Sequence, residues 1–464
     1  MRGRGLVRKE IYYIISLTTT MESSKAFVPE SDCVVVCDAG GSTVRFGFAG
    51  DDHPLDAATY SSYCALKANG ELAIPEKRVC GGDDYSFGDR GLIFHENAIR
   101  HGVFKVVSEG VVTSYSHFHD LWRCAETDLA SASAGEAFSF SEHPVIVAEQ
   151  IACKEEHRRN GFRRHERSKH AEMLFEGVGV PAAFLSNTAV LSCYACGRSS
   201  GLVTDIGSDA ARVAPVIDGE LAWDNVAASA LAGANLDEEM LRILETEYRY
   251  KIRPRYCFTK DVDPRTGAAR IKVVDTPELN GSYRKLCQLR ICEKMKLDVC
   301  KVSQDRWVAS AMDNDEDEAG NTYELPDGTE ISVPLIEHPF PEYLLNPEPL
   351  GRPADFTSLT GLVTEATEKL ATDQRAMLMQ NIVLCGGTSK LEGLPERFAS
   401  EMGAQMATKG HLPRLVFCDR DRREIFPWLG GSILGSLSSF RELWVTKAMY
   451  DEEGPVRVFE THCP

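Results

Sequence analysis

The chain has 464 residues, a length that allows roughly two to four structural units. Its 43% apolar and 26% charged residues are ordinary for a globular protein and exclude a disordered chain, a collagen and a coiled-coil rod. With 51 Lys and Arg against 69 Asp and Glu, the formal net charge is −18. This charge disfavours direct nucleic-acid binding through a basic face, although it does not exclude membership of a complex that binds DNA.

The first 30 residues are predicted to be an extension ahead of the folded chain. Residues Met1–Glu10 are basic and Ile11–Leu17 form a short apolar run, a pattern that faintly resembles a signal peptide. No Ala-x-Ala motif follows this run, so we favour a loose extension upstream of a start at Met21. No apolar run reaches the length of about eighteen residues that a membrane-spanning helix needs, and no membrane partner is expected.

Two segments share one strand–turn–strand pattern. In each, a short apolar strand ends in an aspartate, Asp38 in the first and Asp205 in the second. A turn rich in glycine and serine follows and leads into a second apolar strand. The two aspartates are 167 residues apart, and this repetition of the whole pattern indicates a duplicated unit.

Glycine turns of this kind can bind phosphate, because consecutive backbone N–H groups can point inward. An aspartate at the strand end would repel bare phosphate and fits better as a water-mediated ligand of a divalent cation, while Arg45 adds a forked cation. Two plain β-hairpins are the alternative, since Asp-x-Gly is a common turn, but two matching turns favour a phosphate site. The predicted residues are Asp38, Gly40, Gly41, Ser42, Arg45, Asp205, Gly207, Ser208 and Asp209.

A third glycine turn, within Asn381–Lys390, again follows an apolar strand. Its residues Gly386, Gly387 and Thr388 would permit close approach of a flat ligand such as an adenine ring. The segment Leu391–Met402 is predicted to form a helix. A Walker-type Gly-x-x-x-x-Gly-Lys-Ser/Thr motif is absent, so the sequence does not support a P-loop.

The 15 cysteines are an odd number spread through apolar segments, which predicts buried free thiols in a reducing compartment rather than a disulfide framework. The lone Cys-x-x-Cys motif, Cys193–Cys196, is more typical of core packing than of a metal or redox site. The basic segment Arg158–Arg167 is the nearest candidate for a nuclear-localisation cluster, and it is predicted instead to be the polar face of a helix.

The three turns, in this order, resemble the nucleotide site of the actin, Hsp70 and sugar-kinase superfamily. Three further segments narrow the resemblance to the actin family, over residues 31–464: Thr188–Gly201, Tyr323–Gly328 and Trp428–Phe440. Within that family the chain is most similar to the nuclear actin-related protein 4 subfamily, through Thr43–Gly50, Pro254–Lys260 and Cys463–Pro464. The resemblance implies an α/β fold of the ribonuclease H-like type, two-lobed, with four subdomains around a nucleotide cleft.

The resemblance also implies how the chain divides among these subdomains. Subdomain one would comprise 31–60, 97–195 and 426–464; subdomain two 61–96; subdomain three 196–231 and 351–425; and subdomain four 232–350 with insertions. Residues 62–88, where actin has a loop that contacts its neighbour in a filament, are charged here, and a non-filamentous protein is expected.

For the site, the resemblance implies ATP with Mg²⁺ as cofactors. Asp38 and Asp205 would hold the metal through water, and Glu293 would contact the ribose. Actin positions its attacking water with a glutamine and a histidine, and these positions are Thr188 and Arg212 here. Because a guanidinium cannot act as a base near neutral pH, turnover is expected to be very slow or absent, and no residue is assigned a catalytic role.

The resemblance further implies a partner groove, which in actins receives an amphipathic helix. Its residues would be Tyr194, Gly197, Ser199, Ile433, Leu434, Leu437 and Leu443. Helical spacing allows Ile433, Leu434 and Leu437 to be simply the core face of a helix, and one face can serve both roles.

The leading hypothesis is a non-enzymatic, ATP-binding structural subunit of a nuclear chromatin-remodelling or histone-acetyltransferase complex. It would dock, together with actin, on the helicase/SANT-associated helix of a remodelling ATPase. The alternative is a cytoskeletal, cytoplasmic actin-like protein that regulates filament assembly through ATP hydrolysis, which Thr188 and Arg212 disfavour. A sugar or acetate kinase would need a carboxylate base facing a substrate pocket, and the sequence offers no such set of residues.

Overall fold

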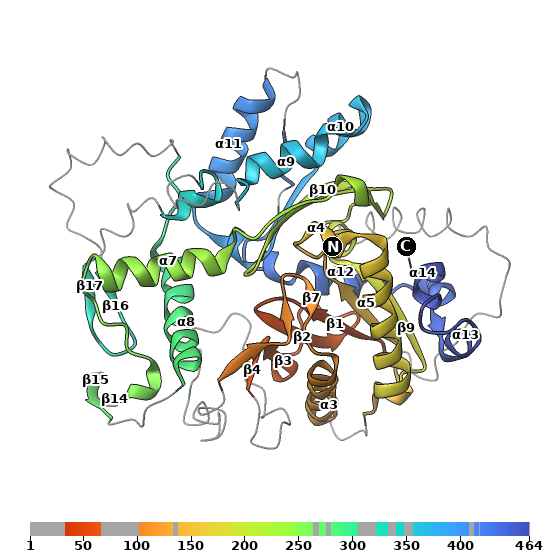
Figure 1. The fold of residues 1–464 in the computed structure, drawn as a ribbon, viewed down its shortest axis with the longest axis horizontal. Helices are drawn as coiled ribbons and strands as arrows, with labels where there is room; N and C mark the ends of the chain where they lie inside the picture. The colour runs from red at the N-terminus through yellow and green to blue at the C-terminus, as the bar shows by residue number, and fades with distance from the viewer. Residues whose placement is uncertain are drawn as a thin grey trace.

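The structure, a computed structural model, describes residues 33–65, 102–132, 138–262, 269–274, 280–304, 322–332, 340–347, 356–407, 413–416 and 418–463. The predicted extension 1–30 lies outside the described residues, as does most of the predicted subdomain two and of the charged segment 62–88. The described part forms two lobes, each built on its own β-sheet with helices packed against it (Figure 1). The prediction of an α/β protein with two lobes is therefore confirmed.

The first lobe is built on a six-stranded sheet in the order β19-β9-β8-β1-β2-β3. Strand β1 is antiparallel to β2 and parallel to β8, and β8 is parallel to β9. The strands are β1 (Val35–Ala39), β2 (Thr43–Phe48), β3 (Thr59–Ser61), β8 (Val145–Glu149), β9 (Ala182–Asn187) and β19 (Val445–Thr446). The helices of this lobe are α3 (Tyr115–Ala132), α4 (Glu155–Arg158), α5 (Asn160–Glu172), α6 (Thr188–Ala195), α12 (Phe426–Gly435), α13 (Lys447–Glu453) and α14 (Val458–His462).

The second lobe is built on a five-stranded sheet in which β12, β11, β10 and β18 are neighbours and β13 also pairs with β11. Its strands are β10 (Gly201–Ile206), β11 (Ala211–Ile217), β12 (Glu220–Leu221), β13 (Ala227–Ser229) and β18 (Ile382–Cys385). The helices are α7 (Gly233–Thr246), α8 (Gly281–Val299), α9 (Leu359–Glu368), α10 (Thr372–Met379) and α11 (Leu394–Ala407). Four two-stranded hairpins complete the described strands: β4 (Tyr63–Ala65) with β5 (Val103–Lys105), β6 (Val107–Ser108) with β7 (Val111–Val112), β14 (Phe258–Val262) with β15 (Ala269–Val273), and β16 (Thr322–Glu324) with β17 (Glu330–Ser332).

The two sheets repeat one design. In the first hairpin Asp38 on β1 lies opposite Arg45 on β2, and in the second Asp205 on β10 lies opposite Arg212 on β11. Each aspartate strand is also parallel to a strand that comes later in the chain, β8 in the first sheet and β18 in the second. The shared register is what a duplicated unit produces, and it places both aspartates at the carboxyl ends of their strands.

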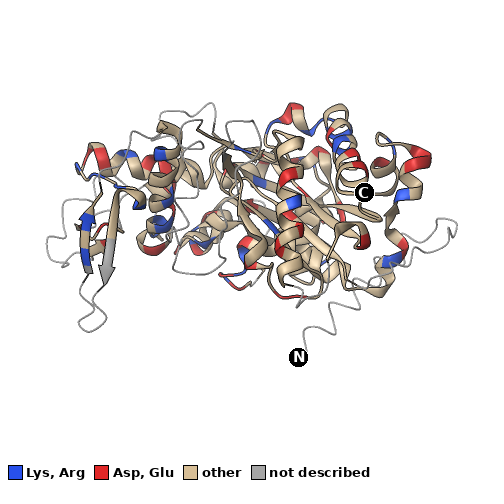
Figure 2. Cartoon of the chain, turned by 90° about the horizontal axis from the view of Figure 1, so that it is seen from below, with Lys and Arg blue, Asp and Glu red and all other residues tan. Residues whose placement is uncertain are grey.

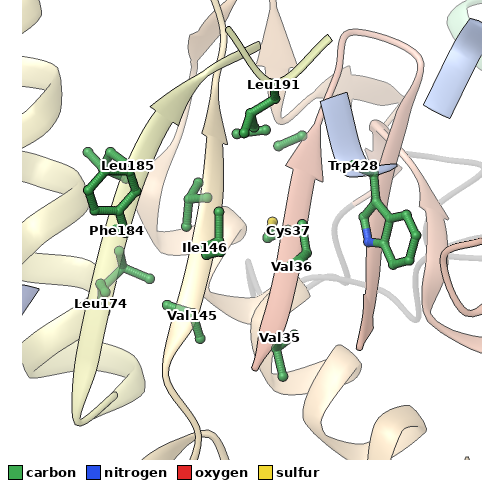
Figure 3. Close-up of a cluster of buried hydrophobic side chains, with 14 of the residues drawn as sticks. Val35, Val36, Cys37, Val145, Ile146, Leu174, Phe184, Leu185, Leu191 and Trp428 are labelled. Carbon is green, nitrogen blue, oxygen red and sulfur yellow. The ribbon is translucent and has the colours of Figure 1, made fainter. Parts of the chain in front are cut away.

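The core of the first lobe lies between its sheet and the helices on either side, and Figure 3 shows part of it around Val35, Val36 and Ile146. All residues of β1 are buried, as expected for a central strand that is covered on both faces. Helix α12 packs closely on α6, because a Cβ added at Gly430 would lie 1.9 Å from the Leu191 carbonyl oxygen. The Gly-Gly pair after Trp428 is thus needed for helix packing.

Two local predictions are corrected by the structure. The basic segment Arg158–Arg167 is not one polar helix face, because the helix is interrupted at Arg159 and Arg167 is buried. The Arg167 guanidinium lies 2.8 Å from the Glu149 carboxylate. This ion pair lies in the interior and not on a solvent-exposed face of a helix. The helix predicted from Leu391 begins three residues later, at Leu394, because Gly387–Lys390 form a 3-10 turn and Gly393 adopts a positive φ.

Charged side chains of both signs are distributed along the helices (Figure 2). In the view of Figure 2, blue and red segments are interspersed along the described helices. Among the described residues, no helix has both the length and the apolar character needed to cross a bilayer.

Candidate functional site between the lobes

A cleft of about 750 Å³ lies between the two lobes, within the range of small-molecule sites. All three glycine turns line it, together with the first turn of helix α7 and one face of helix α8. The lining includes every residue that the sequence assigned to nucleotide binding: Asp38, Gly40, Gly41, Ser42, Arg45, Asp205, Gly207, Ser208, Asp209, Glu293, Gly386, Gly387 and Thr388. Nucleotide binding in this cleft stays a prediction.

The first two turns close in the same way. The Gly40 N–H donates to the Thr43 carbonyl at 2.8 Å, and the Gly207 N–H donates to the Ala210 carbonyl at 3.1 Å. A Cβ added at Gly40 or at Gly207 would lie 3.3 Å from that carbonyl oxygen, so both turns leave little room for a side chain. Both turns are therefore β-hairpins, and both line the same cleft. A hairpin structure is thus compatible with the predicted phosphate site.

Burial disfavours the ionised form of both strand-end aspartates, Asp38 and Asp205. Asp38 is 3% exposed, and burial raises the pKa of its carboxyl to about 6, although Arg45 opposes this shift and Asp205 adds to it. Burial likewise raises the pKa of Asp205, against the effect of Arg212. Each arginine lies 3.5 Å from its aspartate, which is too long for a strong charge-assisted hydrogen bond.

This electrostatic arrangement fits a divalent cation. Two carboxylates whose ionised forms are disfavoured by burial gain from a cation placed between them and phosphate oxygens. Within the described residues, no group of three or more His, Cys, Asp and Glu could hold a metal ion directly. Asp38 and Asp205 both line the cleft, and their role as water-mediated ligands of a metal stays a prediction.

Gln150 is a cleft residue that the sequence analysis missed. Its amide donates to the Asp38 carboxylate at 3.3 Å. It follows directly after β8, which is parallel to β1, so its side chain lies at the same sheet edge as Asp38. The rule that ligand residues gather at the carboxyl ends of parallel strands could have identified it.

The third turn rests on the second. Gly386 has φ +86°, and a Cβ there would lie 2.4 Å from both Asp205 Oδ1 and the Ile206 carbonyl oxygen, so only glycine fits. The Thr388 hydroxyl donates to the Gly207 carbonyl at 2.8 Å and ties the two turns together. Glu424 lies against Gly387, on the side of the cleft that the resemblance assigns to the nucleotide base.

Helices α7 and α8 hold the second turn from the other side. The Gly233 and Ala234 N–H groups at the start of α7 donate to the carbonyls of Gly207 and Ser208, at 3.1 and 2.8 Å. Lys296 on α8, buried at 2% exposure, donates to the Gly233 carbonyl. Its ammonium also lies 2.7 Å from the Asp237 carboxylate, a buried ion pair at the cleft wall.

Asp209 has a different partner from the one expected of a phosphate turn. Its carboxylate forms an ion pair with Lys105 of β5 and accepts the Glu109 N–H at 3.3 Å. A Cβ added at Gly41 would lie 2.3 Å from Asp209 Oδ2, so the Asp209 carboxylate fills the space beside Gly41. The Asp209 side chain of the second turn thus packs directly against the first turn.

Thr188 and Arg212 line one small cavity that adjoins the cleft, and Arg212 also lines the cleft itself. Both line a small cavity with Ile151 and Asp205, and Thr188 does not line the cleft itself. The Arg212 Nε donates to the Ile151 carbonyl at 2.5 Å, from the second lobe to the first. Arg212 is 6% exposed, and it acts as a tie between the lobes.

The predicted partner groove is largely part of the core. Tyr194, Leu434 and Leu437 are buried within the first lobe, whereas Ile433 and Leu443 are partly buried and pack on its surface. Gly197, with φ +68°, and Ser199 lie in the turn that follows α6 and are also partly buried. The packing accounts for the apolar spacing, and binding of a helix to this face stays a prediction.

Comparison with known proteins extends the resemblance over nearly the whole chain. The actin family profile, described as "Actin", matches residues 30–464. "Actin-related protein 4" of Oryza sativa subsp. indica is 30% identical over 458 residues, covering 93% of this chain and 98% of that protein. "Actin-related protein 4" of Arabidopsis thaliana is 30% identical over 372 residues (78% and 80%), and that of Yarrowia lipolytica is 27% identical over 451 residues (94% and 98%).

Proposed function

The chain belongs to the actin family, and from this premise we propose that it is an ATP-binding, non-filamentous structural subunit of a nuclear complex that remodels or acetylates chromatin. Actin-family proteins bind a nucleotide with a divalent metal, and the similarity to actin-related protein 4 spans nearly the full chain. The proposal adds to these facts the identity of the cofactors, ATP and Mg²⁺, the absence of turnover, the nuclear location and the partners.

One observation carries the nucleotide part of the proposal. Two hairpins in the same register present Asp38 and Asp205 to one cleft, each beside a glycine turn and an arginine. The glycine turns supply backbone donors for phosphate, and bound Mg²⁺ would relieve the burial of both carboxylates. Arg45 lines the cleft with its guanidinium 3.5 Å from the Asp38 carboxylate, and its forked N–H groups would donate to phosphate.

Turnover is proposed to be very slow or absent because Thr188 and Arg212 stand at the two positions where actin has the glutamine and histidine that hold the attacking water. Thr188 has one hydroxyl and is buried against a small cavity that adjoins the cleft, since both are lined by Asp205 and Arg212. The Arg212 guanidinium is not a proton acceptor; it donates to the Ile151 carbonyl and lies 3.5 Å from the Asp205 carboxylate. General base catalysis at this position would require a group that titrates near neutral pH.

The partner part of the proposal is that this face of the first lobe docks, together with actin, on the helicase/SANT-associated helix of a remodelling ATPase. Ile433 and Leu443 offer partly exposed apolar surface beside the turn of Gly197 and Ser199. An amphipathic helix binds such a surface through anchors spaced three and four residues apart. The net charge of −18 favours contact with DNA through other subunits of the complex.

The test begins with the purified full-length chain. Calorimetric titration with ATP and Mg²⁺ should give saturable binding, and Asp205→Asn should weaken it in the presence of Mg²⁺ because that carboxylate would lose its negative charge. The same sample should release no phosphate above the background of buffer and nucleotide. Absence of binding to the wild-type protein would refute the nucleotide part, and hydrolysis at the rate of filament-forming actin would refute the structural role.

Affinity purification of the tagged chain from nuclear extract tests the partner part. We expect to recover actin and a remodelling ATPase, and to lose both with Ile433→Asp and Leu443→Asp while nucleotide binding persists. The cytoskeletal alternative makes the opposite prediction: recovery of cytoskeletal factors only, and sedimentation of the pure protein as filaments in Mg²⁺ and salt.

A further inference from the structure

Two half-buried cysteines, Cys196 and Cys418, meet where the chain crosses between the lobes. Cys196 ends helix α6, and the chain then enters β10 of the second sheet. Cys418 lies on the return crossing, between Leu415, which pairs with Ile382 of β18, and helix α12 of the first lobe. The two Sγ atoms are 3.4 Å apart although 222 residues separate them in sequence.

The surroundings of the two thiols differ in a way that suits a nucleophile and its partner. The two thiols share a hydrogen bond, which lowers the pKa of the Cys418 thiol against the opposing effect of burial. The Cys418 thiol also donates to the Val416 carbonyl at 3.2 Å. The positive charges of Arg423 and Arg198 lower the pKa of Cys418 further. The pKa of Cys196 is raised by the hydrogen bond between the two thiols and by burial. Cys418 therefore has the more thiolate character.

We propose that Cys196 and Cys418 form an oxidative modification site at which a peroxide converts the two thiols into a disulfide. In the first step the Cys418 thiolate attacks one peroxide oxygen, the O–O bond breaks, and protonation of the leaving oxygen yields water or an alcohol and a sulfenic acid. In the second step the Cys196 sulfur attacks the sulfenic sulfur, the S–O bond breaks, and water leaves with the Cys196 proton. Two thiols are oxidised and one peroxide is reduced.

The neighbouring thiols explain why the reaction selects this pair. Cys193 and Cys385 lie close to it but are buried, with 0% and 1% exposure. Burial raises the pKa of Cys193 to about 12, and it also raises the pKa of Cys385. Both neighbours therefore have less thiolate and less access to a peroxide than Cys418. The free cysteines of the described residues otherwise include Cys124, a half-buried thiol on α3 that serves as a control.

A disulfide between Cys196 and Cys418 would link the two segments in which the chain crosses between the lobes. Motion of one lobe relative to the other has to bend both crossings, and a covalent link between them removes part of that freedom. The pair also lies beside Gly197, in the turn that follows α6, so oxidation would stiffen the surface next to it. The inference depends only on the cysteines and their positions, and it stands whether or not a nucleotide binds.

The test treats the full-length reduced protein with hydrogen peroxide and maps cysteines by mass spectrometry after digestion without reductant. We expect one cross-linked peptide pair that contains Cys196 and Cys418, reversible by dithiothreitol, and a loss of two free thiols per chain. Cys196→Ser should abolish the cross-link and leave Cys418 as sulfinic acid, because no resolving thiol remains. Cys124→Ser should leave the yield unchanged.

Hydrogen exchange of the same samples tests the consequence. Amides on the two crossings should exchange more slowly in the oxidised wild-type protein than in the reduced one, and the Cys196→Ser protein should show no such change. The proposal is overturned if peroxide oxidises other cysteines while these two remain as thiols, or if Cys418 pairs with a different cysteine. Because the mapping uses the wild-type protein, this outcome is decisive even if a variant folds poorly.

Discussion

Asp38 couples the candidate site to pH. Burial raises the pKa of its carboxyl to about 6, so the folded protein holds a proton there at pH values where the unfolded chain has lost it. The stability of the ligand-free protein therefore falls as the pH rises from about 4 to about 6. Above about pH 6 the Asp38 carboxylate is ionised in both states, and its contribution to stability no longer changes with pH. A Mg²⁺–nucleotide complex needs the ionised carboxylate, so it must displace this proton at low pH.

The first prediction follows from that competition. Affinity for Mg²⁺–ATP should be constant above about pH 7 and should fall below about pH 6, approaching tenfold per pH unit, because one proton must be released on binding. Calorimetric titration at several pH values measures it. Asp38→Asn should bind more weakly and without this pH dependence. An identical pH profile in Asp38→Asn would assign the proton to another group.

Arg212 gives a second prediction at the same scale. It is buried between the lobes, donates to the Ile151 carbonyl and lies 3.5 Å from Asp205. Arg212→Ala should lower the free energy of unfolding by about 3 kcal/mol, since it leaves the Ile151 carbonyl without its donor and the partly buried Asp205 carboxylate without its nearby cation. Urea denaturation measures the change.

Arg159 supplies the matched control for this measurement. Its guanidinium pairs with Glu155 at 3.7 Å, but its side chain is 73% exposed. Arg159→Ala should change the unfolding free energy by less than about 0.5 kcal/mol. If Arg212→Ala were equally mild, Arg212 would not tie the lobes together.

At the residue scale the sequence was most informative where a backbone turn decides the chemistry. The glycines and strand-end aspartates are recognised from local spacing, and all of them line the cleft. Lys105 and Lys296 were not foreseen, because their partners Asp209 and Asp237 lie 104 and 59 residues away and only the folded chain brings them together. Long-range ion pairs leave no local pattern in one sequence.

At the scale of elements, the third turn and helix α11 contain glycines with opposite requirements. Gly386 has a positive φ and contacts Asp205 and Ile206, so Gly386→Ala should destabilise the protein by about 3 kcal/mol or more. Gly403 lies inside α11 with no atom within 4 Å of an added Cβ, so Gly403→Ala should stabilise it by about 0.5–1 kcal/mol. Thermal unfolding of both variants should give shifts of opposite sign, and a stabilising Gly386→Ala would contradict the packing of the third turn on the second.

Element boundaries depend on tertiary contacts that a local pattern does not contain. The apolar strands β1 and β10 were predicted correctly, since continuous apolar runs ending in a turn are typical of buried parallel strands. The segment Arg158–Arg167 was misjudged because its charges suggest a solvated helix, whereas Glu149 pairs with Arg167 in the interior. The start of α11 was misplaced because Gly393 needs a left-handed conformation beside Val302.

At the scale of the whole molecule, the two-lobed fold was expected from the resemblance to the actin family, and the predicted family and its similarity to actin-related protein 4 are confirmed by the comparisons. The division into four subdomains stays a prediction. The duplication does not determine which residues join the outer ends of the two lobes. Ser61 of β3 and Arg290 of α8 come from different lobes, and so do Val103 of β5 and Ser282 of α8.

These two contacts lead to the last prediction. The Arg290 guanidinium donates to the Ser61 hydroxyl at 2.9 Å, and the Val103 N–H donates to the Ser282 hydroxyl at 3.1 Å. Both contacts join the lobes, and we expect a bound nucleotide to leave faster when they are weakened. Loss of the buried, charge-assisted bond in Ser61→Ala removes about 1.5 kcal/mol, which corresponds to roughly tenfold faster release.

Stopped-flow chase of a fluorescent ATP analogue measures the release rate. Ser282→Ala should have a smaller effect than Ser61→Ala, because its hydrogen bond is exposed to water. Ser436→Ala, whose hydroxyl bonds only within its own exposed turn, is the control and should release nucleotide at the wild-type rate. Equal release rates in all three variants would mean that the outer contacts do not limit opening, and the tie at Arg212 would then be the element that holds the lobes together.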